Sequence, residues 1–443
     1  MVRLRILSFI VGLVIVFGMT NASAQVTIEE VDLGDGALGR YRAPAVGPVS
    51  HIGFLSIHRT NDYRNHQSSV ELANRGFGTL GIRTRFGNDE AAVNFELIAL
   101  DIRNGVRFLR SKGHTRVILV GRSGGGPSTS YYQALAENGP SYCQGHKKIT
   151  ECPFTDTDFN AADRANGIVF TDAHPGVGVN GLRSVNASVV NENQPFGPAT
   201  NKTLDPFDPA NGYNSLPPDH APDGDSTYSD HFVDKYSLAQ SRRMNNLIKD
   251  ALAIKRKMEL GLHDPADDAF VLNRVNARLV QLTTQVHCCT LNPTRLLQDA
   301  TGTLSAPQII RTVRVPTPDI KDDDENSPEE FTITSFLTAN AIRSHHSLDD
   351  IDWCSTNNST VCAVRVISVP TLVLAHQGHY FIRDGEEIFE NVAAIDKEFI
   401  VVEGATHGGG NCNECAAYHG TGRYVNVLPN TWNYVANWAN ARF

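Results

Sequence analysis

Short apolar runs alternate with amphipathic stretches through the first 180 residues of the chain. One stretch, residues 91–112, carries apolar residues at spacings of four and three, which predicts a helix with one buried face; they are Ile98, Ile102, Val106 and Leu109. A second helix is predicted over residues 128–137. The runs predicted as strands are residues 26–33, 51–58, 78–85, 116–120 and 166–171. Strands that alternate with helices favour a parallel, doubly wound sheet.

The alternation stops between residues 181 and 365 and then resumes. This middle part predicts a long helix over 231–260, a second helix over 268–282 and a solvated acidic loop over 321–330, for which calcium binding is the alternative. After it come a strand at 369–375, a helix at 386–394, a strand at 398–402 and a helix at 430–441. We therefore predict an α/β fold with a doubly wound, mostly parallel sheet. Its core is residues 25–180 and 366–443, and a large, mainly helical cap is inserted at 181–365 over the strand ends, where such sheets bind ligands.

The first 24 residues have the pattern of a secretory signal peptide. Two arginines precede an apolar stretch, and Ala22-Ser23-Ala24 is a small-residue cleavage site. That stretch is shorter than the roughly 20 residues a membrane-spanning helix needs, and no other segment is long or apolar enough. The sequence thus predicts a secreted or periplasmic protein. Its net charge of −9 argues against nucleic acid as a partner and gives no support for binding to anionic membranes.

Eight cysteines fall in four close sets. In an exported protein such sets indicate disulfides, and Cys143–Cys152 and Cys354–Cys362 are predicted as short-loop bridges. The other four, Cys288, Cys289, Cys412 and Cys415, can pair with one another, or form a tetrathiolate zinc site as the rival interpretation.

Ser123 lies in Gly-Arg-Ser-Gly-Gly, directly after the apolar run Val117-Ile-Leu-Val120. A G-x-S-x-G pattern between a strand and a helix places a serine on a sharp turn, where its hydroxyl is presented as a nucleophile. Glycines on either side relieve crowding around the strained serine. The alternative without a catalytic role is a glycine-rich connection with an exposed serine.

Serine catalysis requires a base within hydrogen-bond reach of the hydroxyl and an acid that orients the base. His407 follows a late apolar strand in Glu-Gly-Ala-Thr-His-Gly-Gly-Gly, and the glycines after it allow this loop to come close to other segments. Position and context therefore single out His407 among the sixteen histidines as the candidate base.

With these two motifs the chain resembles the α/β-hydrolase superfamily, which contains esterases, lipases and related serine hydrolases. Ser123 matches the nucleophile elbow and His407 matches the histidine loop. The resemblance covers roughly residues 45–180 and 366–443, and not the insertion. It implies a sheet with catalytic groups on the loops at its edge, and says little about the substrate.

The acid departs from the family pattern. The family commonly places it a few residues after the penultimate strand, where this chain has His379. Asp172, directly after the strand at 166–171, fits an alternative position found in some members, and it is the predicted acid. Asp384 is the second candidate, although it also suits the N-cap of the following helix. Glu386 and Glu387 are further alternatives.

The oxyanion hole departs from the pattern as well. It should combine the amide of Gly124 with an amide from the loop after the strand at 51–58. The family often has His-Gly there, whereas this chain has His58-Arg59-Thr60. The backbone amides of Arg59 and Thr60 are the predicted donors, and the Arg59 side chain can alternatively bind a substrate carboxylate.

These features predict an exported serine hydrolase that cleaves a small-molecule carboxylic ester through an acyl-enzyme on Ser123. The chemistry requires no metal and no organic cofactor. Cleavage of amides, thioesters or carbon–carbon bonds uses the same groups, and these reactions stay open. A non-catalytic binding protein of the same fold is the alternative from a different class.

Overall fold

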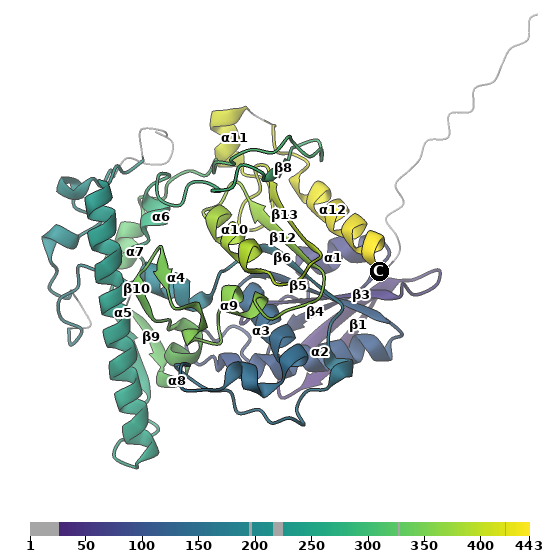
Figure 1. Cartoon of the computed structure of the whole chain (residues 1–443), viewed down its shortest axis with the longest axis horizontal. Coiled ribbons are helices and arrows are strands. Elements are labelled where there is room, and N and C mark those ends of the chain that lie inside the picture. Colours follow the sequence, from purple (N-terminus) through teal and green to yellow (C-terminus); the bar gives the residue numbers. More distant parts are fainter. Residues whose placement is uncertain (1–25, 195–196, 216–224, 327, 421) are drawn as a thin grey trace, which may run out of the picture.

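A nine-stranded sheet forms the centre of the molecule (Figure 1). The computed structural model describes residues 26–194, 197–215, 225–326, 328–420 and 422–443, so the predicted signal peptide lies outside the described residues. In spatial order the strands are β1 (Val26–Gly34), β2 (Ala37–Pro44), β4 (Gly78–Arg83), β3 (Ile52–Ile57), β5 (Arg116–Ser123), β6 (Gly167–Ala173), β12 (Thr371–His376), β13 (Lys397–Val402) and β8 (Leu296–Gln298).

Every neighbouring pair from β4 to β8 is parallel, whereas β1 and β2 form an antiparallel edge. Parallel neighbours need crossover connections, and helices provide most of them here. The predicted α/β class with a doubly wound, mostly parallel sheet is confirmed.

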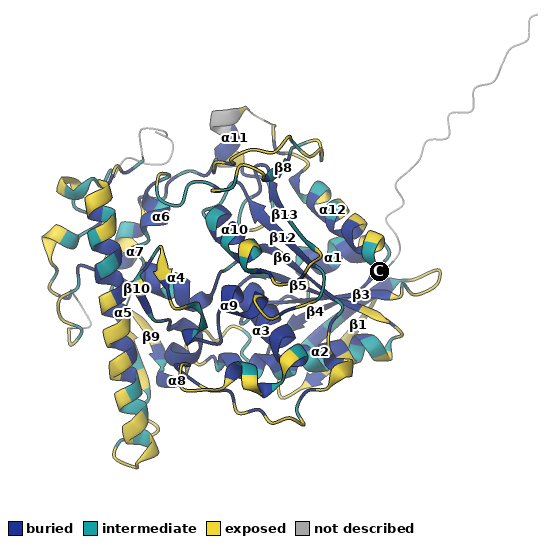
Figure 2. Ribbon diagram, viewed as in Figure 1, coloured by how far each residue is buried: buried dark blue, intermediate teal, exposed yellow. Residues whose placement is uncertain are grey.

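Both faces of the sheet are covered, which explains why its central strands are apolar at almost every position (Figure 2). On β5, Val117 and Leu119 pack on the side of α2 (Ile98–Ser111), α3 (Gly125–Asn138) and α10 (Ile382–Asn391). Ile118 and Val120 pack on the opposite side, with α1 (Gln67–Asn74) and α12 (Val427–Arg442). The period of two along each strand thus divides the core into two layers.

The segment predicted as the cap packs around one long helix, α5 (Asp230–Glu259), at the left of Figure 1. Met244, Leu247 and Ile248 of α5 are buried against α4 (Val177–Ser184) and the π-helix Phe336–Asn340. Two short antiparallel ribbons, β7 (Ala269–Leu272) with β9 (Glu329–Thr332) and β10 (Ser344–His346) with β11 (Asp350–Ile351), complete it. One piece of the same segment, β8, joins the main sheet beside β13. The cap boundaries at 181 and 365 stay a prediction.

Three elements differ from expectation. The predicted helix at 268–282 is β7 followed by a short helix, α6 (Leu279–Leu282), because Arg274 takes a left-handed φ of 47° and β7 pairs with β9. The acidic loop predicted at 321–330 is the helix α7 (Ile320–Asn326) followed by β9. Its Asp324 is buried and accepts hydrogen bonds from Asn186 Nδ2 and the Asn276 amide at 2.8 and 3.0 Å.

The third is α10, which begins at Ile382 with Phe381 as its N-cap. Asp384 is therefore inside the first turn of that helix, and its interpretation as the N-cap is wrong.

All eight cysteines are paired. The structure contains the two predicted bridges, Cys143–Cys152 and Cys354–Cys362, together with Cys288–Cys289 and Cys412–Cys415. These pairings leave no four-thiolate set for zinc. Within the described ranges, no helix combines the length and the hydropathy needed to cross a bilayer.

Candidate active site

Ser123 occupies the sharp turn between β5 and α3, with a left-handed φ of 54°. A side chain at the neighbouring glycines would collide with backbone or core: a Cβ at Gly121 would lie 2.4 Å from Thr129 Oγ1, and one at Gly125 2.1 Å from the Ile57 carbonyl oxygen. One at Gly126 would lie 2.5 Å from the Ala173 Cβ. The glycines are thus what allows a non-glycine residue to hold this strained conformation.

His407 lies on the loop after β13, and its Nε2 is 3.0 Å from Ser123 Oγ. Arg122 fixes this loop, because its Nη1 donates to the His407 carbonyl oxygen at 2.6 Å. Gly409 has a φ of 77°, and a Cβ there would meet the Gln67 amide at 2.3 Å. The serine and the histidine that the sequence analysis selected are therefore in hydrogen-bond contact, although 284 residues separate them.

Asp172, at the end of β6, completes a chain of contacts with these two residues. Its Oδ2 is 2.6 Å from His407 Nδ1, and its backbone has a left-handed φ of 44°. Burial by itself raises the pKa of this carboxyl, but the nearby His379 and His376 rings and the hydrogen bonds from His379 and His407 outweigh it and hold the pKa well below its usual range. Asp172 is therefore a carboxylate at neutral pH, suited to orient His407.

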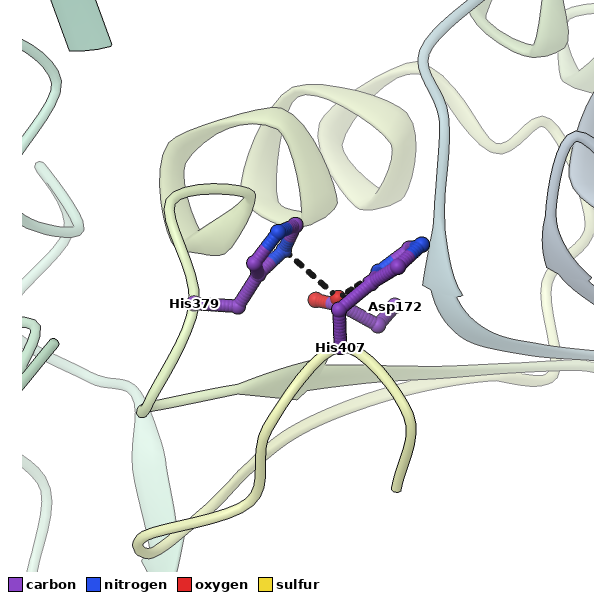
Figure 3. A group of neighbouring side chains, drawn as sticks. All are labelled: Asp172, His379 and His407. Atoms are coloured by element: carbon purple, nitrogen blue, oxygen red, sulfur yellow. Dashed lines mark hydrogen bonds and ion pairs between the residues drawn. The ribbon is translucent and has the colours of Figure 1, made fainter. Parts of the chain in front are cut away.

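His379, which stands at the position where the family pattern expects an acid, lies against the same carboxylate (Figure 3). Its Nδ1 is 2.8 Å from Asp172 Oδ2, and its ring stacks on His407 with centroids 4.3 Å apart. Burial lowers the pKa of His379 to about 4, so its ring is neutral at pH 7. It packs His407 in place from one side.

Among the described residues, Asp172, His379 and His407 are a group whose potential ligand atoms lie within 4.8 Å of one another, so we considered a metal ion there. A metal would require both Nδ1 atoms as lone-pair donors, whereas these atoms lie at hydrogen-bond distance from the carboxylate. Ligand atoms around a tetrahedral zinc at about 2.0–2.1 Å would also stand farther apart than this. The arrangement fits a proton-bearing histidine–aspartate pair better than a metal centre.

His174 is a second histidine on the serine, and the sequence analysis did not select it. Its Nε2 is 3.0 Å from Ser123 Oγ, and its backbone amide donates to the Ser123 carbonyl oxygen. Asn180 Nδ2 lies 2.8 Å from its Nδ1 and 3.2 Å from its Nε2. Burial, followed by His407 and Arg59, lowers the pKa of His174 well below the ordinary value, so the ring is neutral. Its position two residues after Asp172 was the only signal in the sequence.

The predicted oxyanion residues lie together beside the serine. A Cβ at Gly124 would be 3.0 Å from His58 Nε2 and 3.5 Å from the Arg59 Cδ. The Thr60 amide donates to His58 Nδ1 at 3.2 Å, and its hydroxyl donates to Glu90. The amide of Thr60 is therefore already engaged within its own loop.

The other acid candidates point elsewhere. Asp384 is buried against Arg183, with its two oxygens 2.9 and 3.0 Å from Nη1. Glu386 accepts from the Leu291 and Asn292 amides and from Arg295 Nε. Glu387 accepts from the Asn391 side chain at 3.0 Å. Of the candidate acids, Asp172 is the one that contacts His407.

A cavity of about 180 Å³ opens beside this group, between the core and the segment predicted as the cap. His174 and Arg59 contribute to its wall from the core side. Its other lining residues are Val177, Asn180, Gly181, Ser184, Val185, Met244, Leu272, Val275, Arg278, Glu329, Phe331 and Asn340. The serine contacts thus lie at the edge of a space enclosed in part by the insertion.

No family model and no curated protein matches the chain. Among solved structures it is similar to brefeldin A esterase, a bacterial homologue of human hormone-sensitive lipase, at 12% identity and a TM-score of 0.42, covering 98% of this chain and 80% of that one. It is also similar to a proline iminopeptidase from Mycobacterium smegmatis, at 12% identity and a TM-score of 0.38, covering 94% of this chain and 98% of that one. A third similar structure is the alpha/beta hydrolase GrgF from Penicillium sp. sh18, at 10% identity and a TM-score of 0.42, covering 94% of this chain and 99% of that one. The sheet order and the serine at the β5–α3 turn, which are features of the chain itself, give it the α/β-hydrolase fold.

Proposed function

We propose that the protein is an exported serine hydrolase that cleaves a carboxylic ester through an acyl-enzyme on Ser123. The observation that carries the proposal is the unbroken line of contacts from Ser123 Oγ through His407 to Asp172, at 3.0 and 2.6 Å. A nucleophile, a base and an orienting carboxylate at these distances are what serine catalysis requires. The four disulfides support the export part of the proposal, because such bonds persist in oxidising compartments.

In the first half-reaction, Ser123 Oγ transfers its proton to His407 Nε2 as it attacks the ester carbonyl carbon. Asp172 accepts the hydrogen bond of His407 Nδ1 and stabilises the imidazolium that forms. We assign the stabilisation of the oxyanion to the backbone amides of Gly124 and Arg59, since the Thr60 amide is engaged. His407 then protonates the departing alcohol, which leaves the acyl group on Ser123.

The second half-reaction restores the enzyme. A water molecule gives a proton to His407 Nε2 and attacks the acyl carbon, and collapse of the intermediate releases the carboxylic acid as the proton returns to Ser123 Oγ. Amides, thioesters and carbon–carbon bonds are the alternatives, and a panel of p-nitrophenyl esters of increasing chain length, with the corresponding anilides and thioesters, separates them.

Covalent labelling by a fluorophosphonate tests the proposal. Wild-type protein should become labelled at Ser123, located by peptide mass spectrometry, and Ser123→Ala and His407→Ala should lose the label. An exposed serine that is not activated offers the matched control, and Ser141→Ala should label as the wild type does. A folded wild-type protein that does not react would instead indicate a binding protein that keeps the fold.

The identity of the acid has its own test. Asp172→Asn should reduce kcat/KM by about 10⁴-fold, the size of effect seen when a triad aspartate is lost and the histidine takes the wrong tautomer. Asp384→Asn should change kcat/KM far less, because its partner is Arg183. Steady-state kinetics on a p-nitrophenyl ester measures both, and full activity of Asp172→Asn would reject this assignment.

A further inference from the structure

The wall of the cavity beside Ser123 combines apolar side chains with charged ones. Two guanidinium groups, Arg59 from the core and Arg278 from the insertion, line it together with one carboxylate, Glu329. His174 also lines it and is neutral, because burial lowers its pKa. Burial raises the pKa of Glu329 above its usual value, against the opposing effect of the two arginines.

Arg59 has donors that nothing in the described protein uses. Its Nη2 pairs with Glu90 Oε2 at 2.5 Å, whereas its Nε and Nη1 are shielded from solvent and have no hydrogen-bond partner among the described residues. Buried donors that lack an acceptor are unfavourable, and more so when they carry a charge. Arg59 lines the cavity, whereas Glu90, its ion-pair partner, does not.

Arg278, from the insertion, also has a buried donor without a partner among the described residues. Its Nη1 bonds to the neutral amide oxygens of Asn276 and Gln281, both at 3.2 Å, and its Nε is buried without a partner. Within the described chain it forms no ion pair within 4 Å, and Glu329 acts on it only from farther away. The rest of the wall is partly hydrocarbon, from Val177, Val185, Met244, Leu272, Val275 and Phe331, and partly polar, from Asn180, Ser184 and Asn340.

We infer that this cavity is a subsite for a carboxylate carried by the substrate, held by Arg59 and Arg278 while the adjacent ester lies at Ser123. The inference rests on the proposed function. The fork of donors on a guanidinium suits the two oxygens of a carboxylate. The apolar lining accommodates the hydrocarbon that joins the acid to the ester. The substrate class is thus the monoesters of dicarboxylic acids or the esters of carboxyl-bearing alcohols.

Paired substrates test the inference on the full-length mature protein. On the acyl side, mono-p-nitrophenyl adipate is compared with p-nitrophenyl hexanoate, with spontaneous hydrolysis subtracted. On the alcohol side, 3-carboxy-4-nitrophenyl acetate is compared with 4-nitrophenyl acetate. We expect kcat/KM to favour the carboxylate in one of the two pairs by about 10–100-fold, the size of a charge-assisted hydrogen bond.

Variants assign the preference to the two arginines. Arg278→Gln and Arg59→Gln should each reduce the ratio within the favoured pair by roughly 10-fold, chiefly through KM for the charged ester. Arg256→Gln, which removes the same charge from the exposed end of α5, is the matched control and should leave the ratio as in the wild type. Circular dichroism checks that each variant is folded.

The outcomes separate the two proposals. Hydrolysis of both esters in each pair at equal kcat/KM would overturn the carboxylate subsite and leave the serine hydrolase intact. A preference that survives both arginine substitutions would also overturn it. Absence of hydrolysis of all four esters together with absence of fluorophosphonate labelling would overturn the proposed function itself.

Discussion

At Ser123 two histidine rings approach one hydroxyl, and the tautomer of each ring determines whether it donates or accepts. A hydroxyl donates one proton, so Ser123 Oγ can donate to only one of His407 Nε2 and His174 Nε2, both at 3.0 Å. Asp172 accepts from His407 Nδ1, which leaves His407 Nε2 free to accept from the serine. Asn180 Nδ2 lies closer to His174 Nδ1, at 2.8 Å, than to Nε2, at 3.2 Å, so we assign the acceptor role to Nδ1 and the proton to Nε2, beside the serine oxygen. His174 is then a donor that stabilises negative charge on Oγ.

His174→Ala should therefore reduce kcat by about 10–100-fold with little change in KM, somewhat below the effect of losing an oxyanion donor. Asn180→Ala should produce a smaller loss in the same direction, because it releases the tautomer and keeps the ring. The rate of fluorophosphonate labelling should fall in parallel with kcat, which a loss of substrate packing would not cause. Wild-type kcat in His174→Ala would show that the contact is structural.

Between elements, one link from the insertion to the core is a buried ion pair. Arg183 on α4 and Asp384 on α10 are both almost completely shielded, and Arg183 Nε also donates to the Ser347 carbonyl oxygen at 3.1 Å. Breaking such a pair by removing one partner leaves an uncompensated buried charge. The pair thus fixes α4, which carries Asn180 and lines the cavity, against the sheet helices.

Arg183→Met should lower the free energy of unfolding by about 3–5 kcal/mol. Adding Asp384→Asn should recover part of that loss, because the buried charge is removed along with its partner. Arg256→Met breaks the exposed pair with Glu259 and should change stability by about 1 kcal/mol or less. Urea titrations of the four proteins measure this, and equal effects at the two sites would contradict the interpretation.

Across the described part of the molecule, folding moves histidine rings out of solvent. Burial is the main cause that lowers the pKa of seven of them from 6.5: His58, His66, His114, His174, His287, His376 and His379. Each is free to bind a proton near pH 6.5 when unfolded but resists it when folded. Between the lowered pKa of the folded state and pH 6.5, the unfolded chain binds more protons than the folded chain. The stabilisation from these rings is therefore fully present above pH 6.5 and is lost as the pH falls.

The free energy of unfolding should therefore fall between pH 6.5 and 5 with a slope steeper than about 1.4 kcal/mol per pH unit, which is the slope of a single proton. Urea titrations at half-unit pH steps measure it. The depressed pKa of Asp172 adds to the loss only at lower pH, where that carboxylate becomes protonated. A slope of one proton or less would mean that these rings are protonated in the folded state.

The sequence alone was sufficient for the sheet and for two of the site residues. The apolar run before Gly121 and the recurring face of residues 91–112 are local patterns, and strand and helix periods can be read directly from them. Ser123 and His407 are flanked by glycines whose necessity the structure explains, since a Cβ at Gly121 or Gly409 would collide with other segments. At residues 268–282 long-range strand pairing outweighed the local helix pattern, because β7 pairs with β9, which lies about 60 residues later in the chain.

The amino-acid sequence by itself determined the α/β fold class and which serine and histidine are candidates, because each depends on neighbours within a few residues. Only the tertiary structure decided the rest. Asp172 rather than Asp384 contacts His407, His174 is a second ring on the serine, and Arg59 and Arg278 line the same cavity. These residues lie tens to hundreds of positions apart in the chain. Chain folding brings them together, and no local pattern of apolar and polar residues encodes which distant residues become neighbours in space.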